Sequence, residues 1–240
     1  MKLYGELAGW YRLVDPPGDH AEEAEVHARL LLGAVPGART LLELGSGAGH
    51  NALYLKRRFA CTLTDISDAM LALNRELNPE CEILRGDMRL MRLGRRFDVV
   101  LVHDAVMYMT NQGELLAAAL AAFEHTRPGG AALFQPDCIR ETFRESATVE
   151  GSDEGTRSAR FLMWSWDPDP GDETFVTEFA LLLRDGTEMR SEHDRHLEGL
   201  FSREVWVGLL SAVGFEVEVV AGAVPGEPEV EIFLCRRPRE

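Results

Sequence analysis

The sequence predicts an α/β fold whose central feature is a parallel sheet covered by helices on both sides. Apolar runs of strand type alternate with amphipathic helical segments between residues 38 and 136. Several of these runs are apolar at successive positions, which is typical of strands buried on both faces. A turn with glycine at every second position, residues 45–49, joins the first run to a helical pattern. Near residue 140 the pattern changes to longer extended segments, which indicate an antiparallel β insertion.

Each strand and helix of the predicted parallel sheet region is assigned from its own residue pattern and from the residues at its two ends. The expected strands are Thr40–Leu44, Cys61–Thr64, Glu82–Leu84, Phe97–Val102 and Ala131–Gln135. The expected helices are Ala48–Arg58, Asp68–Leu77 and Gln112–His125, with Ser67 as the N-cap of the second. Residues 1–33 also have a helical pattern, broken at Asp15-Pro16-Pro17-Gly18.

The insertion is expected to contain three extended segments, because turn residues divide it twice. These segments are Arg157–Trp166, Thr174–Arg184 and Glu188–Leu197, and Asp185-Gly186 between the last two is a strong hairpin signal. A helix is expected at Ser202–Val213, followed by strands Glu216–Ala221 and Glu229–Cys235 around Pro225-Gly226-Glu227-Pro228.

Composition excludes several classes of partner. The formal net charge is -15, which repels phosphate backbones, so we expect no nucleic-acid substrate. The one dense basic run, residues 89–96, is interpreted as a solvated loop between strands. The four cysteines form no CxxC pair, and free thiols in a reducing compartment are expected. The polar N-terminus and the lack of a long apolar run favour a cytoplasmic protein without a membrane partner.

The glycine turn is the strongest chemical signal in the chain. Gly45, Gly47 and Gly49 form GxGxG, whereas the dinucleotide fingerprint GxGxxG would have its third glycine where His50 stands. Asp65 ends the next strand, where a carboxylate accepts hydrogen bonds from ribose hydroxyls; a helix cap is the alternative. Gly86-Asp87-Met88 follows the third strand, where it meets an adenine group or forms a plain turn.

In this order and spacing, the motifs resemble those of the class I S-adenosylmethionine-dependent methyltransferases, over residues 38–136 and 202–236. The resemblance implies a Rossmann-like, doubly wound sheet of seven strands, mostly parallel with the last strand antiparallel. It also implies S-adenosylmethionine as cofactor. No metal site is expected, because His193 and His196 have no third ligand at a recognisable spacing. The residues expected to contact the cofactor are Tyr11, Glu43, Gly45, Gly47, Gly49, Asp65, Ile66, Asp87, Met88 and His103.

A narrower resemblance points to small-molecule methyltransferases that dimethylate amino sugars. It is carried by Tyr4 and Tyr11, by Gly86-Asp87-Met88-Arg89, by the insertion, and by residues 196–201. It implies a helical lid at residues 1–35, a core at 36–139 and 198–240, and an insertion at 140–197 that covers the substrate site. The segment His103–Met109 departs from this group, because it lacks the small polar pair associated with it.

Three residues are candidates for catalysis. His103 and Asp104 stand at the carboxyl end of the fourth strand, where open parallel sheets bind ligands; a helix cap is the alternative. A functional His103 would line the methionine end of the cofactor, and Asp104 would hold a cationic acceptor or take its proton. His196 is preferred to His193, which points to the other face of the strand. The residues expected to contact substrate are Tyr4, Tyr11, Met107, Tyr108 and His196.

The predicted function is methyl transfer from S-adenosylmethionine to a nitrogen or oxygen atom of a small molecule. The donor is already activated, so alignment of the reactants, which contributes about 7–11 kcal/mol, is the main task of the protein. Two alternatives stay open: a non-catalytic S-adenosylmethionine-binding protein and an NAD(P)-dependent oxidoreductase. Trp164 and Trp166 share a strand face and are expected to pack against the parallel domain or against a second subunit. The second alternative corresponds to a homodimer through the insertion.

Overall fold

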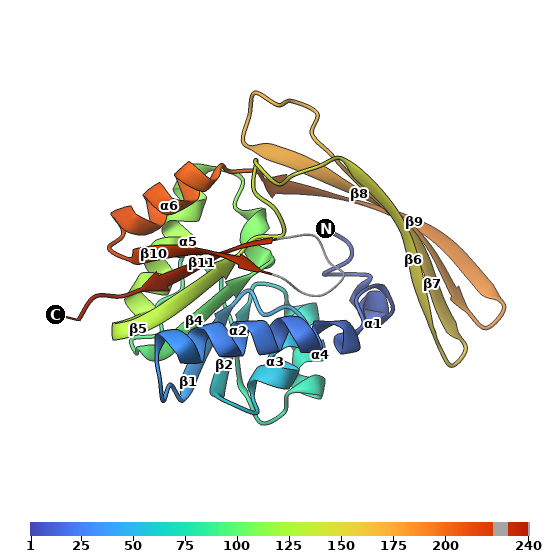
Figure 1. Cartoon of the computed structure of the whole chain (residues 1–240). Coiled ribbons are helices and arrows are strands. Elements are labelled where there is room, and N and C mark those ends of the chain that lie inside the picture. Colours follow the sequence, from blue (N-terminus) through green and yellow to red (C-terminus); the bar gives the residue numbers. More distant parts are fainter. Residues whose placement is uncertain (223–229, 240) are drawn as a thin grey trace.

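The computed structural model describes residues 1–222 and 230–239, and it contains two β-sheets (Figure 1). The larger sheet is formed by β1 (Thr40–Leu44), β2 (Ala60–Asp65), β3 (Glu82–Arg85), β4 (Phe97–His103), β5 (Thr126–Gln135), β10 (Glu216–Gly222) and β11 (Val230–Arg236). Its strand order is β10-β11-β5-β4-β1-β2-β3, with β11 antiparallel to both neighbours. This confirms the predicted seven-stranded, doubly wound sheet with an antiparallel last strand.

Helices cover both faces of this sheet. They are α1 (Tyr11–Val14), α2 (Ala21–Ala34), α3 (His50–Leu55), α4 (Asp68–Leu77), α5 (Gln112–His125) and α6 (Arg203–Ala212), with short 3-10 helices at Ala8–Trp10, Pro17–His20 and Ala105–Tyr108. Alternate residues of β4 supply the two cores, as the two-residue period of a strand requires. Val99 packs on the side of α2 and α3, whereas Val100 packs on the side of α5 and α6.

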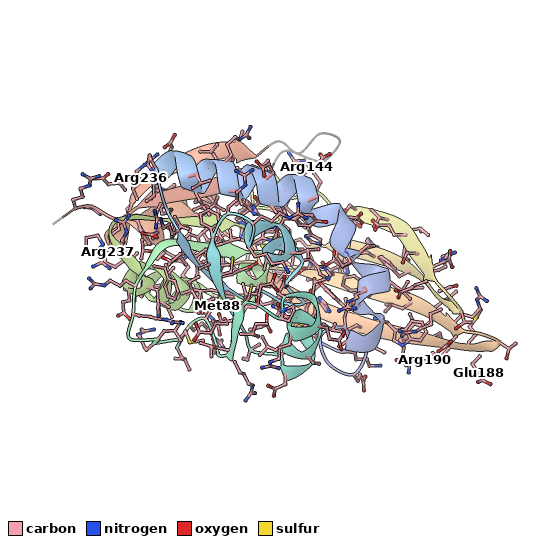
Figure 2. All side chains as sticks on the ribbon, turned by 90° about the horizontal axis from the view of Figure 1, so that it is seen from below. Met88, Arg144, Glu188, Arg190, Arg236 and Arg237 are labelled. Carbon is pink, nitrogen blue, oxygen red and sulfur yellow. The ribbon has the colours of Figure 1, made fainter. Side chains whose placement is uncertain are left out.

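The smaller sheet is antiparallel and is formed by β6 (Ser146–Glu154), β7 (Arg157–Trp166), β8 (Thr174–Asp185) and β9 (Glu188–Gly199), in that order. The insertion is therefore confirmed, but it has four strands rather than the three expected. The strand β6 is not expected from the sequence, because SATVEGSDE has polar residues on both faces and is mostly exposed at the sheet edge. Glu188 and Arg190 mark the far tip of this sheet, well away from Met88 in the core (Figure 2).

Several predicted boundaries shift. The helix expected at Ala48–Arg58 begins only at His50, because Gly49 adopts φ 81 and serves as its N-cap. The N-terminal helical pattern is divided into short helices before α2. Position 229 and the turn at 225–228 lie outside the described residues. Ser67 caps α4 as expected, since its side chain accepts a hydrogen bond from the N–H of Met70.

The N-terminal segment lies between the two sheets (Figure 1). Leu7 and Leu13 pack against Phe161 and Leu181 on the inner face of the smaller sheet. The guanidinium of Arg157 lies 3.9 Å from the centroid of the Trp10 ring. None of the described helices is long and apolar enough to cross a membrane.

Replacing Gly49 with alanine is expected to lower the free energy of unfolding by about 1–3 kcal/mol, because the residue has a positive φ. An added Cβ would also stand 2.2 Å from Oδ1 of Asn74. Urea unfolding measures the effect. Gly33→Ala is the matched control, since nothing lies within 4 Å of its added Cβ. It should instead raise stability by about 0.5–1 kcal/mol. Equal stability of the two variants would contradict the structural role of Gly49.

Candidate active site

A cavity of about 980 Å³ opens at the carboxyl ends of the parallel strands. The larger sheet supplies its floor, the inner face of the smaller sheet supplies one wall, and the N-terminal segment covers it. Ligands of open α/β sheets bind at this edge. The site is therefore assembled from parts of the chain that are distant in sequence.

The glycine turn after β1 borders the floor, and each glycine has a different reason to be there. A Cβ on Gly45 would stand 2.4 Å from the Cβ of Ala105, so the backbone approaches the chain after β4 closely. A Cβ on Gly47 would meet nothing within 4 Å, which leaves open space on the cavity side. Gly49 packs on Asn74 and does not line the cavity. We therefore attribute a structural role to Gly49, although the sequence suggested cofactor contact.

Asp65 ties the glycine turn to the next strand. Its Oδ2 accepts a hydrogen bond from the N–H of Gly47 at 2.9 Å, and its Oδ1 accepts one from the N–H of Ser67 at 2.7 Å. Burial raises the pKa of this carboxyl above its ordinary value, although the backbone hydrogen bonds oppose the shift. Each oxygen keeps further acceptor capacity toward the cavity, which suits the predicted ribose contact.

Asp87 is engaged by its neighbour Arg89. The guanidinium of Arg89 donates to both carboxylate oxygens, and its hydrogen bonds and charge lower the pKa of Asp87. The same guanidinium also pairs with Glu114. The side chains of Met88 and Ile66 line the cavity nearby and offer apolar surface. Arg92 and Arg95 of the same basic run are also ion-paired, with Glu124 and Glu82 respectively.

His103, at the end of β4, is buried within a network of charges. Its Nε2 lies 2.9 Å from Oε1 of Glu23 and 2.7 Å from Oδ1 of Asp104. Burial alone would lower the pKa of His103, but these two carboxylates raise it well above its ordinary value. A protonated Nδ1 needs an acceptor. The Asn51 amide lies 3.1 Å away, and its oxygen otherwise lacks a partner, so the flipped amide supplies one.

The acceptor side of the cavity is acidic. Asp104, Asp137 and Glu198 all line it. The side chain of Asp137 is open to the cavity, yet loss of hydration there raises its pKa well above the ordinary value, and the hydrogen-bonded Asp104 and the nearby Glu198 add to the shift. The pKa of Glu198 is raised by burial, while its hydrogen bond from Thr177 opposes the shift. Asp104 has φ 36, the one positive φ of a described residue other than glycine, and such a backbone is strained.

A second hydrogen-bond network in the cavity joins the N-terminal segment, the short helix at Ala105–Tyr108 and β9. The hydroxyls of Tyr4 and Tyr108 lie 2.9 Å apart, and the Tyr108 hydroxyl lies 2.8 Å from Nδ1 of His196. Nε2 of His196 donates to Oδ2 of Asp194 at 3.1 Å. Burial lowers the pKa of His196 despite Asp194, so the ring is neutral and its Nδ1 accepts from Tyr108.

The structure brings most predicted site residues together, with two exceptions, Gly49 and Met107. Met107 is buried against Phe175 and Leu200 and does not line the cavity; Met109 lines it instead. Sequence reasoning missed Asp137, although it stands two residues after β5, at the same sheet edge as Asp104. Other cavity residues that it missed are Asp15, His20, His50, Asn51 and Glu198. The broken N-terminal pattern gave no signal for the first two.

Comparison with known proteins identifies the class. A profile described as a methyltransferase domain matches residues 41–130. The sheet order, the glycine turn and the acidic residue ending β2 are those of a class I S-adenosylmethionine-dependent methyltransferase. A dTDP-3-amino-3,4,6-trideoxy-alpha-D-glucopyranose N,N-dimethyltransferase of Streptomyces venezuelae is 32% identical over 213 residues, which cover 87% of this chain and 88% of the relative.

Solved structures agree. The crystal structure of Streptomyces venezuelae DesVI matches with a TM-score of 0.83 at 28% identity, covering 92% of each chain. The SAM-bound CalS10, an amino pentose methyltransferase from Micromonospora echinaspora, matches with a TM-score of 0.79 at 28% identity, covering 90% of this chain and 91% of that one. The chain belongs to the family of S-adenosylmethionine-dependent methyltransferases that includes sugar N,N-dimethyltransferases. It is an enzyme of small-molecule methylation, and the oxidoreductase alternative is set aside.

The buried carboxyl of Glu43, on the cavity floor, should make the stability of the protein depend on pH. Burial raises its pKa to about 8, and its Oε2 has no hydrogen-bond partner. Above about pH 5 the unfolded chain loses this proton while the folded protein keeps it, so the carboxyl destabilises the fold increasingly up to pH 8. Glu43→Gln should therefore gain about 1–3 kcal/mol relative to wild type between about pH 5 and pH 8. Urea titrations of both proteins without cofactor measure this gain. Parallel stability curves would contradict it.

Proposed function

We propose that the acceptor is the amino group of an amino sugar, which is methylated twice. The observation that carries this proposal is the acidic wall of Asp104, Asp137 and Glu198 on the acceptor side of the cavity. Such a wall attracts a charged ammonium group more strongly than a neutral hydroxyl. Relatives that cover most of this chain are named as dTDP-amino-sugar N,N-dimethyltransferases, which supports the same substrate class.

The residues present fit S-adenosylmethionine, which carries a positive sulfonium and an ammonium group. The unpartnered Oε2 of Glu43 is a buried acceptor beside the glycine turn and suits a cationic group. We propose that Gly45 and Gly47 underlie the cofactor and that Asp65 accepts from its ribose hydroxyls. The exposed side chain of Ile66 and that of Met88 would then pack on its adenine.

The bound cofactor supplies an activated methyl group for in-line displacement by the acceptor nitrogen. Asp104 and Asp137 hold the acceptor ammonium, and Asp137, whose pKa is raised, takes the proton that makes the amine nucleophilic. His103, already protonated between Glu23 and Asp104, fixes the orientation of Asp104 rather than acting as a base. The neutral His196 accepts from the Tyr108 hydroxyl and so fixes the position of the Tyr108 oxygen in the cavity. Residues 1–35 and 140–197 exclude water above it.

Activity on an amino sugar tests the proposal. Incubation with S-adenosylmethionine and a dTDP-linked amino sugar should yield mono- and dimethylated products with matching S-adenosylhomocysteine, detected by mass spectrometry. The analogue with a hydroxyl in place of the amine should remain unmodified. Methylation of the hydroxyl analogue at a comparable rate would contradict an amine acceptor.

Asp137→Asn should raise the KM for the amine acceptor about 10–100-fold, because a charge-assisted contact is lost. The Kd for S-adenosylhomocysteine, measured by calorimetry, should stay the same. Asp153→Asn is the control: this residue is exposed and ion-paired with Arg160 on the smaller sheet, and its variant should retain the wild-type KM. An unchanged KM in Asp137→Asn would remove Asp137 from the acceptor site.

We further propose that two copies of the chain associate through the outer face of the smaller sheet and that the enzyme is cytoplasmic. The outer face exposes apolar side chains from four strands, namely Val149, Leu162, Trp164, Leu182 and Leu197. Trp164 is 44% exposed, an unusual position for so large a ring in a monomer. Nearby Glu178 pairs with Arg195, so the face offers both charges to an identical copy. The four cysteines are free, which suits the cytoplasm.

Trp164→Glu is expected to convert a dimer into a monomer of 26.7 kDa, because it places a charge at the centre of the contact. Light scattering coupled to size exclusion measures the mass. Leu90→Glu, which changes a residue that is 75% exposed on the core domain, should stay dimeric. A wild-type mass of 26.7 kDa would exclude the dimer.

A further inference from the structure

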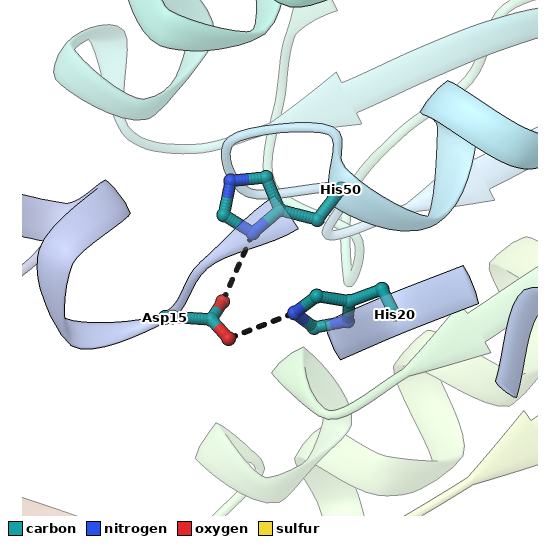
Figure 3. Close-up of side chains that lie close together, drawn as sticks. All are labelled: Asp15, His20 and His50. Carbon is teal, nitrogen blue, oxygen red and sulfur yellow. Dashed lines mark hydrogen bonds and ion pairs between the residues drawn. The ribbon is translucent and has the colours of Figure 1, made fainter. Parts of the chain in front are cut away.

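Three polar side chains from separate elements converge on one corner of the cavity (Figure 3). Asp15 follows α1, His20 ends the 3-10 helix before α2, and His50 begins α3. The carboxylate of Asp15 stands between the two imidazoles: Oδ1 lies 2.7 Å from Nε2 of His20, and Oδ2 lies 3.1 Å from Nδ1 of His50. No step of the methyl transfer described above uses this group.

The two rings are held in place by their surroundings. The second ring nitrogen of His20 faces a carboxylate, with Oε2 of Glu23 3.8 Å from Nδ1. The ring of Tyr11 stacks on His50, with centroids 5.5 Å apart and planes 26° from parallel. A carboxylate behind an imidazole is the usual outer partner of a histidine that binds a metal. These contacts keep both rings beside the Asp15 carboxylate.

We propose that Asp15, His20 and His50 bind a divalent first-row transition metal ion, of which Zn²⁺ is the representative. Their donor atoms all lie within 4.8 Å of one another. An ion about 2.0–2.2 Å from each would therefore fit among them after small side-chain adjustments. Two imidazole nitrogens and one carboxylate oxygen suit zinc, cobalt or nickel, whereas magnesium and calcium prefer oxygen ligands throughout. Three protein ligands leave a coordination position open to the cavity.

The neighbouring cluster of Glu23, His27 and His103 does not offer an equivalent site. His103 is engaged by Glu23 and Asp104, and Nε2 of His27 bonds to Oε1 of Gln135 at 2.9 Å. Neither Glu23 nor His27 lines the cavity, so an ion has no open path to all three. The inference for Asp15, His20 and His50 is independent of the acceptor proposed above, since it concerns binding alone.

Calorimetry of the full-length, tag-free protein with ZnCl₂ tests the site. One equivalent should bind, and Asp15→Asn and His20→Gln should each weaken binding at least tenfold. His193→Gln, which changes an exposed histidine on the outer face, should bind as wild type does. Co²⁺ should give visible d–d bands in wild type, and the bands should be lost in Asp15→Asn. Thermal melts without metal establish that each variant is folded.

The results separate the alternatives. An increase in Tm of wild type with Zn²⁺ that is absent from folded Asp15→Asn and His50→Gln supports the site. The absence of saturable binding in wild type overturns it. Binding that survives in folded Asp15→Asn and His20→Gln, or that is lost in His27→Gln instead, also overturns it, because the ion then lies elsewhere.

Discussion

The active site depends on one carboxylate that joins two strand ends. Asp65 accepts the N–H of Gly47 with one oxygen and the N–H of Ser67 with the other. The first bond fixes the glycine turn after β1, and the second fixes the start of α4. The hydroxyl of Ser67 in turn donates to the carbonyl of Tyr4 at 2.5 Å, which anchors the N-terminal segment over the cavity. A single buried side chain therefore aligns the floor of the site with its cover.

Features that depend on residues close together in the sequence could be predicted, whereas features that depend on distant residues could not. The strands β1, β2 and β4 and the cap of α4 were predictable, because they follow from local apolar patterns and a local hydrogen bond. Asp65 and Asp104 could also be predicted as site residues, because each stands at the carboxyl end of a parallel strand, where ligands bind. The polar edge strand β6 was not predictable, because neither of its faces is apolar enough to show a period.

The contacts between site side chains could not be predicted from the sequence, because their partners are far apart along the chain. His196 contacts Tyr108, 88 positions away, and His103 contacts Glu23, 80 positions away. Such pairs form because the smaller sheet and α2 are packed against the parallel sheet, and no local pattern encodes that packing. Met107 is an example of a wrong prediction that results. It was expected in the site together with its neighbours, but in the short helix at Ala105–Tyr108 its side chain packs against Phe175 instead.

The crowding of carboxylates on the acceptor wall serves two requirements that usually conflict. An ammonium acceptor is attracted by negative charge, yet it must lose a proton before it can react. An isolated aspartate would hold the cation but would be too weak a base to accept its proton at neutral pH. Asp137, beside Asp104 and Glu198, has a raised pKa, which makes it a stronger base than an isolated aspartate. The protonated His103 pairs with Asp104 and offsets part of the negative charge of the three carboxylates. Asp104 can therefore hold the ammonium group while Asp137 takes its proton.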